Sequence, residues 1–202
     1  PLLMTVGLWG TEVAWLALTH LRISQAAMQI ADNASRVGDT STLENKKIYE
    51  SDINDVFRGS DKEAGTAVDL YHHGRVIISS LEVVPGSQGR QYIHWQRCLG
   101  EKQWDSSYGK QGDGLSSSAG FDGMGPDGDK VTAYDDQDAV IFVEIAYDYQ
   151  PLFSKMFIGD TTIDVYGAYN VRDSRDLTQI YQRDPNNPDP VATCDKYTSD
   201  LS

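Results

Sequence analysis

The side chains that could support catalysis are few and poorly placed for it. His72 and His73 are adjacent, so in an extended strand they would point to opposite faces and make poor joint metal ligands. His94 and Cys98 share a strand face, but four residues of strand separate them by roughly 13 Å, too far for a nucleophile and its base. The sequence also lacks the nucleophile-elbow, zinc and phosphate-loop motifs. We therefore predict that the chain is not an enzyme.

One pair of carboxylates offers a different chemistry. Glu144 and Asp148 lie on one face of a predicted strand. Most glycosidases use two carboxyl groups as their catalytic residues. An anchored hydrolase is therefore one interpretation of the chain. The simpler interpretation is an ordinary half-exposed strand, and we favour it.

The segment 101–138 is rich in Gly, Ser and Asp and offers a candidate metal site. Within it, FDGMGPDGD places Asp122, Asp127 and Asp129 in a turn-dense stretch, and carboxylates that converge there would hold a hard cation such as Ca²⁺. The stretch does not match the EF-hand pattern. The alternative, which we favour, is a solvated acidic loop without a bound ion.

The two cysteines, Cys98 and Cys194, are far apart and have no metal-ligand spacing. We predict a disulfide that pins the C-terminal tail to a strand and places the body in an oxidising compartment. In the chain-entropy model such a bridge stabilises by roughly 4 to 5 kcal/mol. The alternative is two unpaired cysteines, one of them buried in a strand.

Charge is distributed unevenly between two parts of the chain. The formal net charge is -13, but residues 1–38 are neutral, because Glu12 and Asp32 balance Arg22 and Arg36. A phosphate-tracking protein concentrates Lys and Arg, so nucleic acid is excluded as a partner. We predict an apolar arm, residues 1–38, joined to an acidic globular body, residues 39–202.

Residues 1–37 predict a single long helix. After Gly10 they contain no helix breaker, and their second half is rich in Ala, Leu, Gln and Met. Such a helix is about 55 Å long, more than a body with a radius of gyration of roughly 15 Å can cover. Part of the helix must therefore project.

The two halves of this helix differ in polarity. Residues 2–21 are apolar around almost the whole circumference, which indicates burial in lipid or in other protein. Residues 21–37 carry an amphipathic stripe suited to packing on a sheet. Twenty residues rise about 30 Å, the thickness of a bilayer core. There is no basic region or small-residue cleavage site of the kind that marks a signal peptide.

Glu12 stands in the middle of the apolar half. A carboxylate there costs on the order of 2.5 kcal/mol or more in a bilayer. One interpretation is a snorkelling or protonated side chain on a tolerated anchor. The other, which we favour, is a charge that is neutralised when the helix leaves lipid and packs among copies of itself, fixing their register.

The N-terminal run reads PLLMTVGLWGTEVAWLALTHLRISQAAMQIADNASR, with Gly7, Gly10 and Glu12 in an apolar stretch that is followed by a helical pattern of Arg, Gln and Ala. This run resembles TadE/TadG-like proteins, the pseudopilins of tight-adherence (Tad, or Flp-type) pili. The resemblance covers about 38 residues, and lower similarity extends into the body. The family's usual glutamate near its processing site has no match here, and only the second acidic position, Glu12, is present. The matching residues are Pro1, Leu2, Leu3, Gly7, Gly10 and Glu12 in the apolar half, and Arg22, Ser24, Gln25, Ala26, Ala27, Ala31, Asp32 and Ala34 in the second.

The body predicts one short helix and a set of β-strands. The segment 50–62 predicts a helix ended by Gly59. Strands are predicted over 66–71, 75–84, 91–98, 139–149 and 161–171, with a tight turn at 72–74. The fold class is therefore α+β, a long N-terminal helix packed on an antiparallel sheet of four or five strands, which is also the pilin-like plan that the resemblance implies.

Aromatic rings are frequent in the body, and two interpretations of them stay open. Large, rigid, partly polar rings suit subunit interfaces or glycan contacts. They equally suit packing in the core and on strand faces. The residues concerned are Trp95, Trp104, Tyr108, Tyr134, Tyr147, Tyr149, Tyr166 and Tyr169.

Together these features predict a pilin-like structural subunit of a bacterial extracellular filament or pilus. The helix would be held in the inner membrane and then pack with copies of itself, and with other pilins, while the body passes through the periplasm and faces solvent. The alternative is a monomeric periplasmic binding module anchored by the same helix. The residues predicted to form the assembly helix are Leu2, Leu3, Val6, Gly7, Trp9, Gly10, Glu12, Val13 and Leu16.

Overall fold

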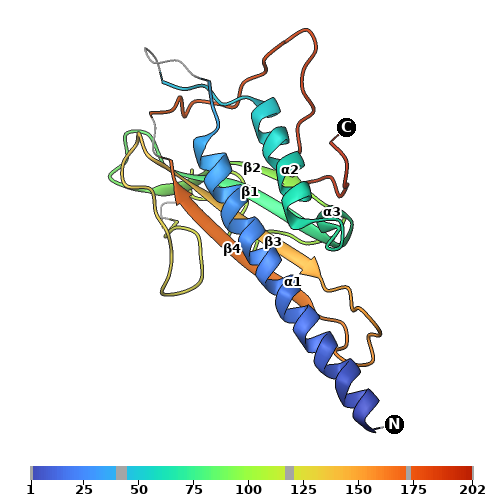
Figure 1. The fold of residues 1–202 in the computed structure, drawn as a ribbon. Coiled ribbons are helices and arrows are strands. Elements are labelled where there is room, and N and C mark those ends of the chain that lie inside the picture. The colour runs from blue at the N-terminus through green and yellow to red at the C-terminus, as the bar shows by residue number, and fades with distance from the viewer. Residues whose placement is uncertain (1, 40–44, 117–120, 172–173, 202) are drawn as a thin grey trace.

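The computed structural model describes residues 2–39, 45–116, 121–171 and 174–201. The strands pair antiparallel in one sheet of order β2-β1-β3-β4. The predicted α+β fold, a long N-terminal helix on a four-stranded antiparallel sheet, is confirmed (Figure 1). In chain order the elements of the described residues are α1 (Leu2–Arg36), α2 (Glu50–Ala64), α3 (Leu70–His73), β1 (Gly74–Val83), β2 (Gln91–Leu99), β3 (Ala139–Asp148) and β4 (Thr162–Asn170).

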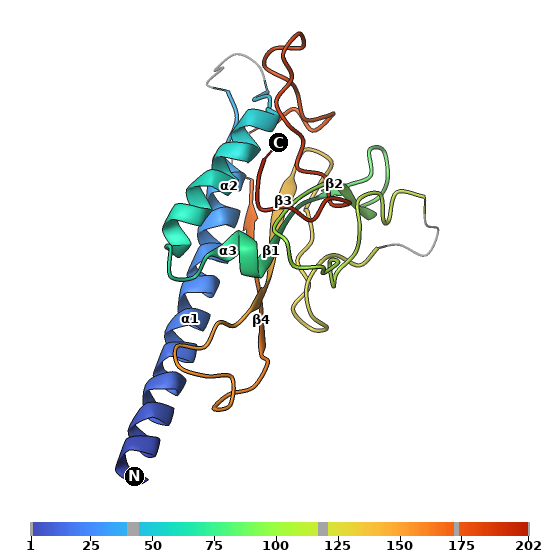
Figure 2. The same cartoon turned by 90° about the vertical axis from the view of Figure 1, so that its right-hand side faces the viewer.

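Both faces of the sheet are covered. The helices α1 and α2 lie on one face, and the long β2–β3 connection lies on the other (Figure 2). The connection packs Tyr108, Phe121 and Met124 against Leu81 and Phe142 of the sheet. As a result every residue of β1, and every residue of β3 except Asp148, is buried.

The second half of α1 belongs to the main hydrophobic core. Its buried residues recur every three or four positions, as expected for one helix face, and they pack with β3, β4 and α2. Gly167 on β4 allows this close approach, because a Cβ there would lie 3.0 Å from the carbonyl oxygen of Ala27. The core residues of this half are Ile23, Ala26, Ala27, Ile30, Ala31 and Ala34.

Two local predictions are wrong. No strand forms over 66–71, because Asp69 adopts a left-handed conformation with φ of 50° and directs the chain into α3; α3 also takes the place of the turn expected at 72–74. Gly59 does not end α2, which continues to Ala64 because Ser60 and Ala64 extend its buried face. Packing there outweighs the cost of about 1 kcal/mol that glycine brings to a helix interior.

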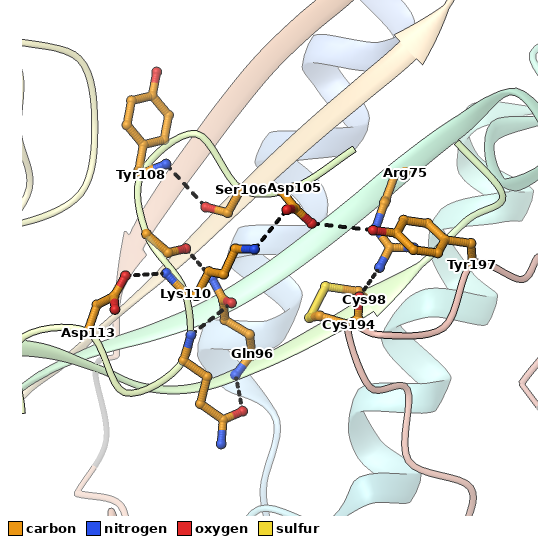
Figure 3. Close-up of polar contacts among 12 residues, drawn as sticks. Arg75, Gln96, Cys98, Asp105, Ser106, Tyr108, Lys110, Asp113, Cys194 and Tyr197 are labelled. Atoms are coloured by element: carbon orange, nitrogen blue, oxygen red, sulfur yellow. Dashed lines mark hydrogen bonds and ion pairs between the residues drawn. A yellow bond between two sulfur atoms is a disulfide. The ribbon is translucent and has the colours of Figure 1, made fainter. Parts of the chain in front are cut away.

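The C-terminal tail is fastened to the sheet. The predicted disulfide between Cys98 and Cys194 is present, and the backbone N–H of Cys98 donates to the Ala192 carbonyl at 2.8 Å. Arg75 on β1 is buried and donates to the carbonyls of Gly100, Cys194 and Lys196 at 2.7 to 3.0 Å (Figure 3). The tail and the outer edge of β2 therefore form one connected unit.

Candidate functional site on the N-terminal helix

The first half of α1 extends beyond the sheet (Figure 1), and its apolar side chains are exposed. Burying one such side chain contributes roughly 1.5 to 3 kcal/mol, so covering this surface with lipid or protein would be strongly favourable. The most exposed are Leu2 at 81%, Leu3 at 90%, Met4 at 78%, Val6 at 62% and Trp9 at 53%, and Leu8 and Val13 follow at 41% each.

By length and composition α1 is able to cross a membrane. Its most apolar window of eighteen residues has a mean hydropathy of 1.4, and 11% of that window is buried. A core helix of a soluble protein would be mostly buried, whereas this half is not. The helix is compatible with a membrane anchor or a signal segment.

Glu12 joins the first half of this helix to the body through hydrogen bonds. Its side chain is fully buried and accepts three hydrogen bonds, from the Tyr149 hydroxyl at 2.6 Å and from the backbone N–H groups of Leu152 and Phe153 at 2.9 Å each. All three donors come from the end of β3 and the connection that follows it. The carboxylate therefore has its partners within its own chain.

The β3–β4 connection lies alongside the projecting half of α1 in both views (Figures 1 and 2). The Trp15 indole N–H donates to the Gln150 carbonyl at 3.3 Å, which adds to the contact made by Glu12. The connection exposes three large apolar side chains, Leu152 at 52%, Phe153 at 49% and Met156 at 89%. Together with the projecting half of α1 they form what we call the apolar arm surface, composed of residues 2–13, 152, 153 and 156.

The predicted assembly residues fall into two groups. Leu2, Leu3, Val6, Gly7, Trp9, Gly10 and Val13 are exposed, whereas Glu12 is buried and Leu16 is partly buried against the core. An added Cβ at Gly7 or Gly10 would meet no atom within 4 Å. The body therefore covers one face of α1 from about Glu12 onward and leaves the preceding turns free.

The acidic connection does not gather its carboxylates around a metal. Among the described residues, no three His, Cys, Asp or Glu side chains lie close enough to hold an ion. The candidate ligands Asp122 and Asp127 instead face the Lys130 ammonium at 3.9 and 3.7 Å, and Asp129 is exposed. For the Ca²⁺ site considered at Asp122, Asp127 and Asp129, the interpretation that we did not favour, two of the three carboxylates therefore lie beside an ammonium group.

The two strand carboxylates have separate surroundings. Glu144 is buried and accepts hydrogen bonds from the Ser106 hydroxyl and the Ser107 N–H; burial raises its pKa to about 7. Asp148 lies at the end of β3 and pairs with Lys102 and Thr162. Four residues of strand place the two carboxylates roughly 13 Å apart, farther than the carboxyl pair of a glycosidase.

The histidines also have individual partners. His72 contacts the Asp69 carboxylate at 2.6 Å, which raises the pKa of this histidine. His94 contacts buried Glu82 at 2.9 Å, and the sulfur of Cys98 is committed to the disulfide. Of the aromatic residues, Trp95, Tyr147 and Tyr149 are buried, whereas Tyr134 and Tyr166 are exposed.

Sequence reasoning missed the β3–β4 connection. Its residues Leu152 and Phe153 follow Pro151 directly after an apolar strand, and large apolar residues in a loop are a signal for a contact surface. The partnership of Glu12 with Tyr149 has no such signal, because 137 positions separate the two residues.

Comparisons with protein-family models, curated proteins and solved structures find no match for this chain. The chemistry of the chain still bears on its location. A disulfide is typical of oxidising compartments outside the cytosol, and an exposed apolar helix indicates contact with a membrane or with another protein.

Proposed function

We propose that the chain is a pilin-like structural subunit that assembles into a bacterial extracellular filament or pilus through its N-terminal helix. The observation that carries the proposal is the apolar arm surface, which the body leaves open at one end of the molecule. Before assembly, the inner membrane would cover this surface. In the filament, other subunits would cover it.

The charge distribution supports this arrangement. The arm, residues 1–38, is neutral, so helices can pack together without repulsion, whereas the rest of the chain carries the whole net charge of -13. Bodies of like charge on the outside would repel one another and keep filaments dispersed. A contact between different surfaces of successive copies does not close on itself and generates a helical polymer.

Two glycines suggest how the helices would pack. Gly7 and Gly10 are one turn apart and have open space beside them. Small residues allow helix backbones to approach closely, as they do between helices in membranes. A lipid anchor has no need of them, because lipid tails pack equally well against leucine.

The role proposed for Glu12 follows from its contacts. Its carboxylate holds the β3–β4 connection beside the helix, so Leu152 and Phe153 keep a fixed position relative to the exposed turns. A neighbouring subunit would meet the helix and the connection together. Glu12 would then set register through this connection rather than through a bond to another copy.

The test is electron microscopy of material sheared from producing cells, with mass spectrometry of any filaments. We expect filaments that contain this chain, and we expect them to disappear in a Gly7→Leu and Gly10→Leu variant. That variant raises the apolarity of the helix, so membrane binding survives while close helix packing is blocked. A matched control is Leu115→Ser, which changes an exposed leucine of the body.

The alternative is a monomeric membrane-anchored binding module. It predicts that the chain is found only in detergent-solubilised membranes, as a monomer, and that the Gly7 and Gly10 substitutions change nothing. That pair of results would overturn the proposal of a filament subunit.

A further inference from the structure

A second region of the molecule has the form of a ligand site and does not depend on filament assembly. It is a pocket of about 540 Å³ at the outer edge of β2, within the range of roughly 300 to 1,000 Å³ that is typical of small-molecule sites. The β2–β3 connection forms one wall and the disulfide-bonded tail forms the other (Figure 3).

The walls of this pocket are fixed in place. Gln96 and Gln111 exchange hydrogen bonds, each backbone N–H donating to the other residue's side-chain oxygen at 3.2 and 3.0 Å. On the opposite side Arg75 holds the carbonyls of Cys194 and Lys196, next to the disulfide. A pre-formed pocket loses less conformational entropy when a ligand binds.

The cationic groups that line the pocket are already engaged. The two terminal nitrogens of Arg75 donate to backbone carbonyls, and its Cζ lies 4.1 Å from the centroid of the Tyr197 ring. The Arg75 Nε has no hydrogen-bond partner but is buried. Lys110 pairs with Asp105 at 2.7 Å, and the side chain of Arg97 pairs with Glu50. An anion would therefore be repelled by the Asp105 and Asp195 carboxylates, and a cation would be repelled by Arg75 and Lys110.

The groups that remain free suit a neutral, hydroxylated ligand. Among the described residues, no acceptor is bonded to the Trp104 indole N–H or to the Gln111 side-chain amide N–H. The exposed Asp195 carboxylate accepts from Thr193 and from its own backbone N–H, and its oxygens have further acceptor positions. Trp104 is half-buried and Tyr197 is 41% exposed, so both present ring surface at the pocket. Aromatic rings with a polar edge favour ligands that have both apolar and hydrogen-bonding faces.

We propose that this pocket binds a neutral saccharide. The C–H faces of the sugar ring pack on Trp104 and Tyr197, the sugar hydroxyls donate to Asp195, and the Gln111 amide donates to the sugar oxygens. A saccharide matches this set because each hydroxyl both donates and accepts, whereas a purely apolar ligand would leave these groups unpaired.

The experiment measures binding of maltose, cellobiose, lactose and chitobiose to the full chain by isothermal titration calorimetry and tryptophan fluorescence. The protein is kept in a zwitterionic detergent, because a detergent with a sugar headgroup would compete. Sulfate and choline serve as anionic and cationic probes. We expect at least one of the disaccharides to bind saturably and the two charged probes to bind more weakly.

Variants locate the binding. Trp104→Ala should weaken saccharide binding about tenfold, as expected for the loss of a stacked ring. Gln111→Ala should weaken it as well, because it removes both the amide donor and the oxygen that accepts from the Gln96 backbone N–H. The matched control is Tyr134→Ala, which removes an exposed ring elsewhere and should leave the affinity unchanged. Circular dichroism checks that each variant is folded.

Three results would overturn the proposal. One is that none of the four disaccharides binds saturably to the folded wild-type chain. Another is that a disaccharide binds with equal affinity to the wild type and to Trp104→Ala and Gln111→Ala, which would place the site elsewhere. The third is that choline or sulfate binds to this pocket in preference to the sugars. None of these results bears on filament formation, which is tested separately.

Discussion

The two halves of α1 share one continuous helix but meet opposite surroundings. In the second half, small and β-branched side chains such as Ala27 and Ile30 are buried against the sheet. In the first half, Leu2, Leu3 and Val6 are larger on average and are 62 to 90% exposed. The difference teaches that apolar residues in one helix serve two purposes: the second half stabilises the fold, and the first half is available for contact with a membrane or another molecule.

The strongest test of this contrast compares one apolar truncation in each half. Ile23→Ala should lower the free energy of unfolding by about 2 to 4 kcal/mol, because Ile23 is fully buried and its loss leaves a cavity. Leu3→Ala, at a residue 90% exposed, should change it by less than about 0.5 kcal/mol. Denaturant unfolding in detergent measures both. Equal effects in the two halves would show that the first half is also packed in the subunit.

A second test concerns Glu144, which lies on the face of the sheet opposite α1, and asks whether its titration changes the free energy of unfolding. Burial raises the pKa of Glu144 from 4.5 to about 7, so the folded chain keeps a proton that the unfolded chain releases in this interval. The stabilisation is fully present below about pH 4.5 and is lost as the pH rises toward 7. Between pH 4.5 and 7 the free energy of unfolding of the wild type should therefore fall by on the order of 2 to 3 kcal/mol relative to that of Glu144→Gln.

Unfolding measured against pH for the wild type and for Glu144→Gln checks this prediction. The difference between the two isolates Glu144 from the other titrating groups. A difference that is flat from pH 4.5 to 7 would show that the folded carboxyl titrates normally. The projecting half of α1 should keep its solvent exposure throughout, because it does not contact Glu144.

A third test acts on the contact between the second half and β4. Gly167→Val should destabilise the subunit by about 1 to 3 kcal/mol, because its side chain would press on the backbone of α1 at Ala27. Thermal unfolding measures the loss. Gly59→Val is the control, because an added Cβ at Gly59 meets no atom within 4 Å and the residue has no positive φ. A loss at Gly167 no larger than the loss at Gly59 would count against tight packing of α1.

The smallest effect is expected at the boundary between the two halves. Glu12→Gln retains one acceptor oxygen but places an amide nitrogen opposite a donor, and it should cost about 1 kcal/mol. Hydrogen exchange should accelerate at the Leu152 and Phe153 amides, which donate to Glu12 in the wild type. Unchanged exchange at these two amides would show that Glu12 does not hold the connection.

Much of this architecture follows from local patterns in the sequence. The apolar runs around Ile78 and Ile141 form strands within one or two residues of the predicted bounds, and the long helix ends at Arg36, within one or two residues of its expected end. These elements are predictable because each has a regular periodicity over many residues. The disulfide was also predictable, since the two cysteines have no metal-ligand spacing.

The remainder depends on contacts between distant segments. The alternation of Thr66 and Val68 resembles a strand, but the backbone at Asp69 turns into a helix that places Leu70 and Tyr71 in the core. The partners of Glu12 and the pocket beside Trp104 arise from chain segments far apart in the sequence. Neither has a periodic or local signature, so only the folded arrangement reveals them.

The disulfide would have a mechanical consequence if the chain were placed under tension. A pull applied between the two termini would pass through the bond between Cys98 and Cys194, which are 96 positions apart, and bypass the residues between them. This shielded segment contains β3 and β4 and corresponds to about 320 Å of extended chain. The pulling force would therefore bypass β3 and β4. When the chain unfolds under tension, its end-to-end extension would be shorter by about 320 Å, because the segment closed by the disulfide cannot extend.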